Sequence, residues 1–161
     1  MSSDGHLSRR GAALALLALG ACGFSPALAP GGAARSLRGR VSVTAPDTIE
    51  GFALRARLQD RLGTGGGDLQ LVVSLDQALE AAAQSRRGDT LRYNVIGAAG
   101  WQLLGPDGAT LGSGQVDGFT SYGATASTVA TQTSATDAQG RLMTILADRI
   151  VAQLVLLDVP A

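Results

Sequence analysis

The sequence has no lysine, one histidine and one cysteine, and these shortages exclude several kinds of chemistry. All 13 basic residues are arginine, and they balance 13 acidic residues in a chain of 161. His6 and Cys22 both lie close to the N-terminus. Beyond them, the chain cannot form a disulfide, a His/Cys zinc site, a thiol nucleophile or a Ser-His-Asp triad. Because the formal net charge is zero, a nucleic-acid-binding protein is not expected either.

Aromatic residues and long apolar runs are also scarce. Aromatics account for 4% of the chain, and the apolar run at residues 11–21 is followed by no second long apolar stretch. That run is about half the ~20 residues that a helix needs to cross a bilayer, so we predict no transmembrane helix. The hydrophobic fraction of 45% is nevertheless enough for one folded domain, which argues against a disordered chain.

The N-terminus has the features of an export signal. A polar start with Arg9 and Arg10 precedes the apolar run, as in a signal peptide. The run ends in Leu19-Gly20-Ala21-Cys22, which resembles the bacterial lipobox, where an aliphatic and two small residues precede the cysteine that is acylated. We therefore predict a signal peptide at residues 1–21 and lipidation of Cys22. A plain secretory peptide cleaved at residues 27–29 is the alternative.

Acylation would fix the protein to a membrane. Each buried CH₂ contributes ~0.8 kcal/mol, and two anchoring signals already hold a protein stably. Gly23 follows the cysteine where an inner-membrane retention signal would have aspartate, which favours the outer membrane. Two prolines and a glycine pair predict an extended tether at residues 22–36, and we expect the folded domain to occupy residues 37–161.

Hydrophobic periodicity in the domain predicts the element order β-α-β-β-β-α. The proline-containing turn at residues 105–108 joins two long arms into an antiparallel hairpin. The alanine-rich segment 78–85 suits an extended or bulged hairpin arm or a helical turn. The expected strands are residues 40–45, 69–75, 90–104 and 110–122, and the expected helices begin near residues 48 and 127 and end near 62 and 157.

This order predicts an α+β fold. Two helices most economically cover one face of a four-stranded mixed sheet, in a two-layer α/β sandwich. The opposite sheet face is then exposed or covered by something outside the domain. Gly97 to Gly100 in the third strand suit a surface that another element approaches closely.

Several motifs in sequence order resemble the lipopolysaccharide-assembly lipoprotein family LptE, of the alphaproteobacterial type. The resemblance begins at the lipobox and extends to the last helix. This sequence departs from the family pattern after Pro26: the family often has Leu-Tyr at the next two positions, whereas this chain has Ala27-Leu28. The motifs are Cys22-Gly23-Phe24-Ser25-Pro26, the segment from Arg86 to Tyr93, Phe119-Thr120-Ser121-Tyr122, Arg141-Leu142-Met143, and Leu146-Ala147-Asp148-Arg149-Ile150.

The resemblance implies a non-enzymatic role, without a cofactor or a catalytic residue. In this family the lipoprotein plugs the outer-membrane β-barrel LptD, supports assembly of that barrel, and assists lipopolysaccharide delivery to the cell surface. The Thr/Ser/Gly/Ala-rich segment 110–136 independently suits packing and hydrogen bonding in a polar barrel lumen. An auxiliary lipoprotein of an ABC-type lipid transporter is the nearest alternative.

Two groups of residues are candidate contacts. Arginine binds phosphate in a bidentate manner, so Arg86, Arg87 and Arg92 are candidates for the lipopolysaccharide phosphates; otherwise they are solvated turn charges with Asp89 as a local partner. The candidates for barrel contact are Tyr93, Phe119 and Tyr122, although aromatic residues on strands more often belong to a core.

Two further patterns have simpler interpretations. The glycine-rich segment 63–67 lacks the Gly-Lys-Ser/Thr of a phosphate loop and is expected to be a flexible connection. Asp76 and Glu80 are acidic residues that a hydrolase could pair, but their spacing gives no sign of convergence.

Overall fold

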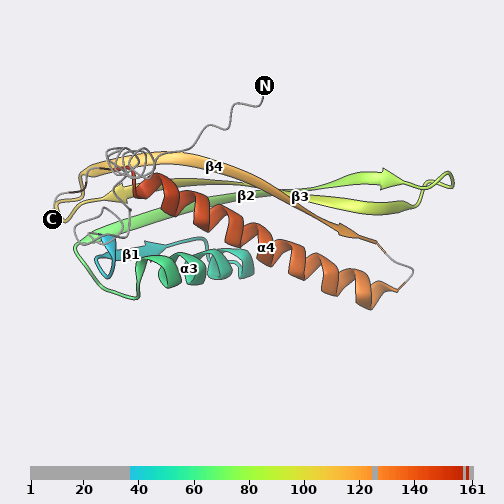
Figure 1. Cartoon of the computed structure of the whole chain (residues 1–161), viewed down its shortest axis with the longest axis horizontal. Helices are drawn as coiled ribbons and strands as arrows, with labels where there is room; N and C mark the ends of the chain where they lie inside the picture. Colours follow the sequence, from blue (N-terminus) through green and yellow to red (C-terminus); the bar gives the residue numbers. More distant parts are fainter. Residues whose placement is uncertain (1–36, 125–126, 158, 160–161) are drawn as a thin grey trace, which may run out of the picture.

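The computed structural model describes residues 37–124, 127–157 and 159 (Figure 1). The predicted signal peptide, Cys22 and the tether lie outside the described residues. The predicted order of elements is confirmed. The elements are β1 (Val41–Thr44), α3 (Ile49–Leu62), β2 (Leu69–Gln84), β3 (Thr90–Leu104), β4 (Thr110–Gly123) and α4 (Thr128–Leu154).

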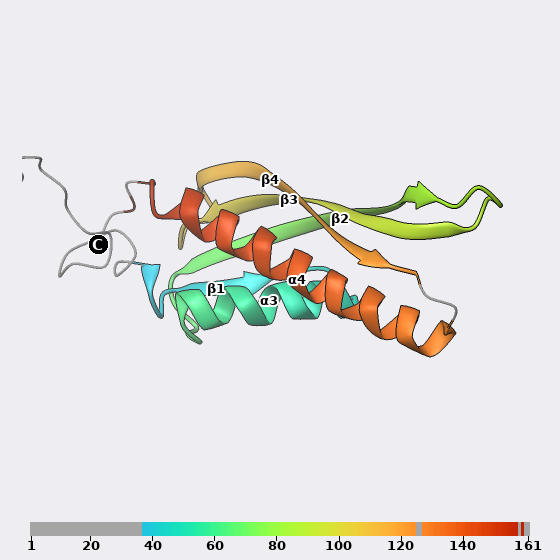
Figure 2. The same ribbon diagram turned by 45° about the vertical axis from the view of Figure 1, so that its right-hand side comes forward.

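The four strands form one mixed sheet in the order β1-β2-β3-β4. β1 pairs with β2 in parallel, whereas β2 with β3 and β3 with β4 are antiparallel. Both helices lie on the same side of the sheet, with α4 crossing β3 and β4 and α3 beside β1 (Figures 1 and 2). The predicted two-layer α+β architecture is therefore confirmed. No helix in the described part of the chain is long and apolar enough to span a bilayer.

Helix α3 begins and ends at the residues that the sequence indicates. The Thr48 side chain accepts a hydrogen bond from the Gly51 amide at 3.0 Å, and Gly63, at φ +86°, terminates the helix. At the start of the helix, the apolar residues Ile49 and Phe52 are exposed. Gly51 is buried in their place, since a Cβ there would lie 2.1 Å from the carbonyl oxygen of Pro46.

Helix α4 packs closely onto the sheet above a pair of glycines. Gly97 of β3 lies opposite Gly118 of β4. A Cβ at Gly97 would lie 2.9 Å from the Leu142 Cδ2 atom, and one at Gly118 would lie 3.2 Å from the Ile145 Cγ2 atom. The helix can therefore approach this part of the sheet only because both positions lack a side chain.

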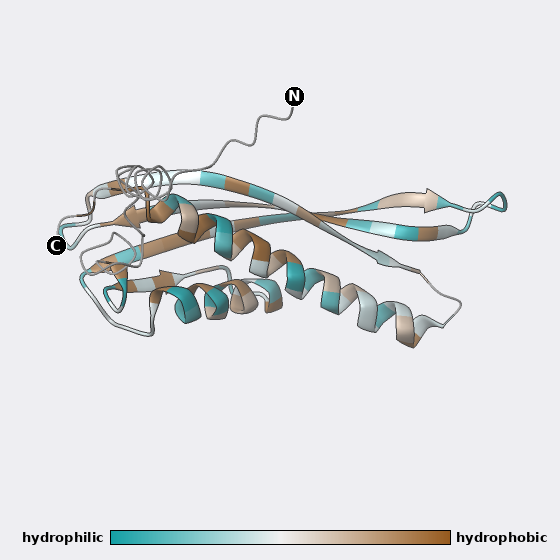
Figure 3. Ribbon diagram, viewed as in Figure 1, coloured by the Kyte–Doolittle hydropathy of each residue, from teal (hydrophilic) through white to brown (hydrophobic). Residues whose placement is uncertain are grey.

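Strand β2 is longer than its hydrophobic pattern indicates. It continues through the alanine-rich segment to Gln84, with register shifts against β3 at Ala81–Ala83 and Ala83–Gln84, so the bulged arm is the correct alternative. The resulting hairpin extends past both helices (Figure 1). Hydrophobic residues concentrate where helices and sheet face each other, and the hairpin turn is hydrophilic (Figure 3).

A candidate interaction surface on the hairpin arm

We call the outer part of the β2–β3 hairpin, residues 76–94, the arm. Strand β4 flanks β3 as far as Arg92, so the arm becomes a two-stranded ribbon only toward its turn. All β2 residues from Asp76 to Gln84 are exposed, on both faces of the ribbon. An isolated two-stranded hairpin is at best marginally stable in water. The arm therefore offers a long surface whose burial against a partner would add stability.

The turn at the end of the arm is held by Ser85. Its amide donates to the Asp89 carbonyl at 2.8 Å, and its Oγ accepts from the amides of Arg87 and Asp89 at 3.2 Å each. The same hydroxyl donates to an Asp89 carboxylate oxygen at 3.2 Å. Gly88 adopts φ +89°, a conformation that favours glycine. The carboxylate of Asp89 is thus part of the turn.

The structure places Arg86, Arg87 and Arg92 together at this end of the arm, all exposed. None of the three has an ion pair with a carboxylate among the described residues. The expected local partner, Asp89, is hydrogen-bonded to Ser85. Three guanidinium groups without a carboxylate partner leave their donors available to an external anion.

Other arginines of the domain have structural partners. Arg40 donates to Asp68 through two nitrogens at 2.7 and 2.9 Å, and this hydrogen bonding lowers the pKa of the Asp68 carboxyl. Arg61 donates to Asp148 at 2.9 Å and likewise lowers the pKa of that carboxyl. The contrast sets the arginines of the turn apart from those that hold the fold together.

The three candidate aromatic residues do not form one cluster. Tyr93 and Tyr122 lie opposite each other on β3 and β4, on the face that the helices cover, and their rings stack at 5.4 Å with an interplanar angle of 23°. Both are half-buried. Phe119 is an odd number of residues from Tyr122, so it lies on the opposite sheet face, where 67% of it is exposed. Of the three aromatic side chains, Phe119 is therefore the one that is largely exposed to solvent.

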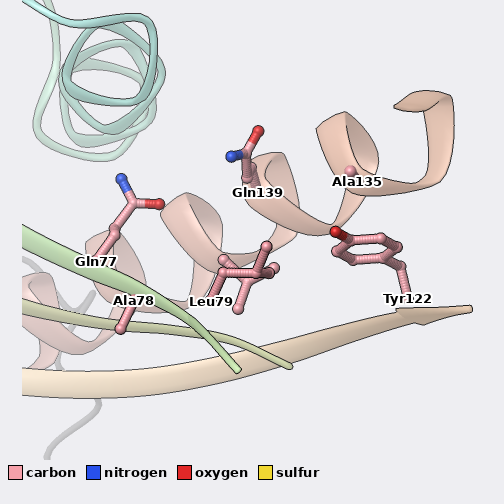
Figure 4. A pocket seen from close by; sticks show the side chains of 7 residues that line it. Gln77, Ala78, Leu79, Tyr122, Ala135 and Gln139 are labelled. Carbon is pink, nitrogen blue, oxygen red and sulfur yellow. The ribbon is translucent and has the colours of Figure 1, made fainter. Parts of the chain in front are cut away.

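A small cavity lies between the base of the arm and α4 (Figure 4). Its volume is about 190 Å³, below the ~300–1,000 Å³ typical of ligand pockets. We therefore treat the arm as a contact surface. The cavity is lined by Gln77, Ala78 and Leu79 of β2, Val95 of β3, Tyr122 of β4, and Ala135 and Gln139 of α4.

No group of ligating side chains in the described ranges could hold a metal ion. Asp76 and Glu80 are both exposed on β2. Neither side chain has a hydrogen bond or an ion pair to another described residue. The two carboxylates lie four residues apart along one strand, roughly 13 Å by the strand rise, so this pair does not converge on one substrate position.

One feature of α4 was not predicted from the sequence. Its polar side chains donate to carbonyl oxygens along the outer edge of β4: Arg141 to Ser121, Arg149 to Asp117, and Gln153 to Gln115. The spacing of four and eight residues puts these donors on one helix face. The periodicity could have predicted that these three side chains share one helix face. It could not have identified their acceptors, which lie on β4.

Comparison with known proteins identifies relatives of this fold. The family model described as "LptE: Lipopolysaccharide-assembly" matches residues 38–154. No curated protein matches the chain. Among solved structures, a lipoprotein from Caulobacter crescentus CB15 is 23% identical with a TM-score of 0.63, and the alignment covers 76% of this chain and 92% of that one.

Two further solved structures have the same fold at lower identity. Rare lipoprotein B from Shewanella oneidensis is 14% identical with a TM-score of 0.53, covering 71% of this chain and 91% of that one. A minor lipoprotein from Acinetobacter baumannii is also 14% identical with a TM-score of 0.53, covering 73% and 90%. At these identities the structures support the fold alone.

Proposed function

Because the chain belongs to the LptE family of lipopolysaccharide-assembly proteins, we propose that it enters the LptD β-barrel of the outer membrane, supports that barrel's assembly and assists lipopolysaccharide transport. It acts as an anchored binding protein and not as an enzyme. The observation that carries this proposal is the family match, which extends over nearly the whole described domain.

Anchoring at the outer membrane is part of the same proposal. Cys22 follows a lipobox-like sequence and is followed by Gly23. Acyl chains on Cys22 would hold the protein on the periplasmic side of the membrane through residues 22–36. Mass spectrometry of the mature N-terminus tests this step: an acylated cysteine is expected, and an unmodified N-terminus after residue 29 would contradict it.

The surface of the arm supports enclosure by a barrel. A porin-like lumen is polar, and β2 in the arm exposes mainly alanine and glutamine, with Asp76 and Glu80 on one face. Small side chains allow a wall to approach the ribbon closely. Exposed Phe119, on the free sheet face, adds an aromatic contact to the barrel, while stacked Tyr93 and Tyr122 support the arm and offer their exposed edges.

The arginines of the turn are proposed to meet lipopolysaccharide phosphates. Arg86 and Arg87 lie in the turn and Arg92 lies close behind it on β3, all without a carboxylate partner among the described residues. Guanidinium groups match the geometry of phosphate oxygens. Their position at the end of the arm lets them reach a ligand beyond the folded core.

Depletion of the protein tests the transport role. Surface lipopolysaccharide is measured by labelling intact cells, while total lipopolysaccharide is measured in lysates. We expect the fraction of lipopolysaccharide at the cell surface and the amount of assembled barrel to decrease together. Unchanged surface lipopolysaccharide, with a defect in phospholipid distribution instead, would favour an auxiliary lipoprotein of an ABC-type transporter.

A further inference from the structure

The two edges of the sheet differ in how their backbone is protected. Exposed strand edges are templates for pairing with other chains, and proteins commonly cover or blunt them. The β4 edge is covered by hydrogen bonds from Arg141, Arg149 and Gln153 of α4. At the other edge, β1 pairs only with residues 69–72 of β2. From Val73 onward, β2 has no strand beside it in the described part of the chain.

The hydrogen-bond pattern shows which residues of β2 point outward at this edge. The Leu69 amide donates to the Arg40 carbonyl, on the β1 side, at 3.0 Å. Because successive residues alternate between the two sides of a strand, the odd-numbered residues of β2 point away from β3. Leu75, Gln77, Leu79 and Ala81 therefore direct their N–H and C=O groups outward. No side-chain or turn hydrogen bond from another described residue reaches these groups.

The side chains along this edge differ between the two faces of β2. On the helix-covered face, Leu75 is half-buried and Leu79 is 57% exposed. On the opposite face, Asp76 and Glu80 are exposed and form no ion pair with any described residue. A strand added here would meet Leu75 and Leu79, with Gln77 between them, on one face and two carboxylates on the other.

We propose that the open edge of β2, from Leu75 to Ala81, accepts an extended segment of a partner polypeptide in which apolar residues alternate with lysine or arginine. The backbone groups of the four outward residues bind the segment, in the manner of strand addition. The apolar side chains of the segment pack against Leu75 and Leu79. Its basic side chains project from the other face, and two of them, four residues apart, face Asp76 and Glu80.

Two other occupants fit the edge less well. An antiparallel pairing with a second copy, centred on Ala78, would place Asp76 opposite Glu80 twice, and like charges directly opposite destabilise a sheet. The chain's own residues 22–36 contain two prolines, which lack an N–H group, and a glycine pair. A basic and apolar segment of another protein has neither disadvantage.

Hydrogen exchange of the full chain provides the direct test. The probe is a capped ten-residue peptide of alternating valine and lysine, and the control is the same peptide with glutamate in place of lysine. We expect the amides of Leu75, Gln77, Leu79 and Ala81 to exchange roughly tenfold more slowly with the lysine peptide only. Unchanged exchange at these four amides, or equal protection by both peptides, would overturn the proposal.

Proline substitutions separate edge pairing from general binding. Gln77→Pro removes an amide that points outward and leaves the ladder to β3 intact, a position where strands tolerate proline. Gln115→Pro is the matched control on β4, since the Gln115 carbonyl also points outward. We expect roughly tenfold weaker peptide binding for Gln77→Pro and no change for Gln115→Pro. Equal effects of the two substitutions would contradict edge pairing.

A second variant keeps the test valid if Gln77→Pro does not fold. Asp76→Asn with Glu80→Gln changes only exposed side chains, so the fold is retained while the lysine peptide binds more weakly at low salt. Unchanged binding would overturn the proposal that basic residues of the partner segment face Asp76 and Glu80. A concentration-dependent dimer in sedimentation, dissociated by Gln77→Pro, would instead identify a second copy as the occupant and overturn the proposed one.

This inference depends on the sheet edge alone and can fail separately from the proposed function. If the chain copurifies with the barrel while the four amides still exchange freely in that complex, edge pairing is wrong and the transport role is unaffected. If the lysine peptide protects the four amides but no barrel is recovered, the transport role fails and edge pairing is retained.

Discussion

Arg61 of α3 donates a hydrogen bond to Asp148 of α4 at 2.9 Å, and this contact joins the two helices on the covered face of the sheet. Arg57, one helical turn earlier, lies 3.6 Å from the same carboxylate oxygen. Asp148 is thus shared by two arginines of α3. The residues lie far apart in sequence, so the pair reports on helix packing in the folded state.

Asp148→Asn should lower the free energy of unfolding at neutral pH. Asp148 is 37% exposed, so we expect a loss of no more than about 1 kcal/mol. Urea denaturation measures it. Asp60→Asn is the control, because Asp60 is 70% exposed and pairs with Arg57 of its own helix only. An equal loss for both variants would contradict a specific role for the contact between helices.

The same contact predicts a pH dependence. The hydrogen bond from Arg61 holds the pKa of Asp148 below its ordinary value of 3.8, so the folded state releases this proton more readily than the unfolded state. The stabilisation is therefore complete above pH 3.8 and is lost as the pH falls through the folded-state pKa. The stability difference between the wild type and Asp148→Asn should shrink in acid. A constant difference would contradict the account.

Gly97→Ala should destabilise the fold by about 1 kcal/mol or more, because the new Cβ lies 2.9 Å from Leu142 and forces that side chain to move. Gly140→Ala is the opposite case, since a Cβ there has nothing within 4 Å in the middle of α4. It should stabilise the protein by roughly 0.5–1 kcal/mol. Thermal unfolding compares both, and stabilisation by Gly97→Ala would contradict the close packing of α4.

Arg86→Ala with Arg87→Ala should weaken binding of purified lipopolysaccharide without changing the melting temperature. Neither side chain has a carboxylate partner among the described residues, so its removal costs the fold little. Arg55→Ala on α3, where Arg55 lies 4.6 Å from the Phe52 ring, is the control and should bind normally. The difference should diminish with added salt. Equal binding by all variants would exclude a role for the arginines of the turn in lipopolysaccharide binding.

Phe119 and Tyr122 should respond differently to truncation. Tyr122→Ala removes a stacked and half-buried ring, so we expect a stability loss of at least ~0.5–1.5 kcal/mol. Phe119→Ala removes an exposed ring and should leave stability unchanged while reducing recovery of the barrel complex. Two measurements on each variant distinguish these effects: its unfolding curve, and the amount of barrel that copurifies with it. A stability loss at Phe119 as large as that at Tyr122 would contradict the proposed division.

Local patterns predicted much of the fold because the responsible interactions are local. The alternation in residues 90–104 matches β3, and Thr48 and Gly63 bound α3 as their chemistry indicates. The full length of β2 could be recognised only as one of two alternatives, because alanine favours a helix by intrinsic propensity and the segment becomes a strand through its pairing with β3. Pairing decides between them.

The candidate surface was less accessible to sequence reasoning. The arginines of the turn were identified by type and position, but the Ser85 hydrogen bonds that occupy Asp89 depend on the turn geometry. Likewise, Tyr93, Phe119 and Tyr122 look equivalent in sequence. Only the register between β3 and β4 shows that Tyr93 stacks on Tyr122, whereas the alternation of β4 places Phe119 on the other face.

The central claim, that this lipoprotein works inside a barrel, is tested most directly by photo-crosslinking in living cells. A photoreactive amino acid at Ala82, which is exposed on the arm, labels whatever surrounds the ribbon, and the products are identified by mass spectrometry. We predict a light-dependent adduct with the LptD barrel. Adducts with an ATPase complex alone, or a chain that remains uncrosslinked beside an abundant barrel, would contradict the account.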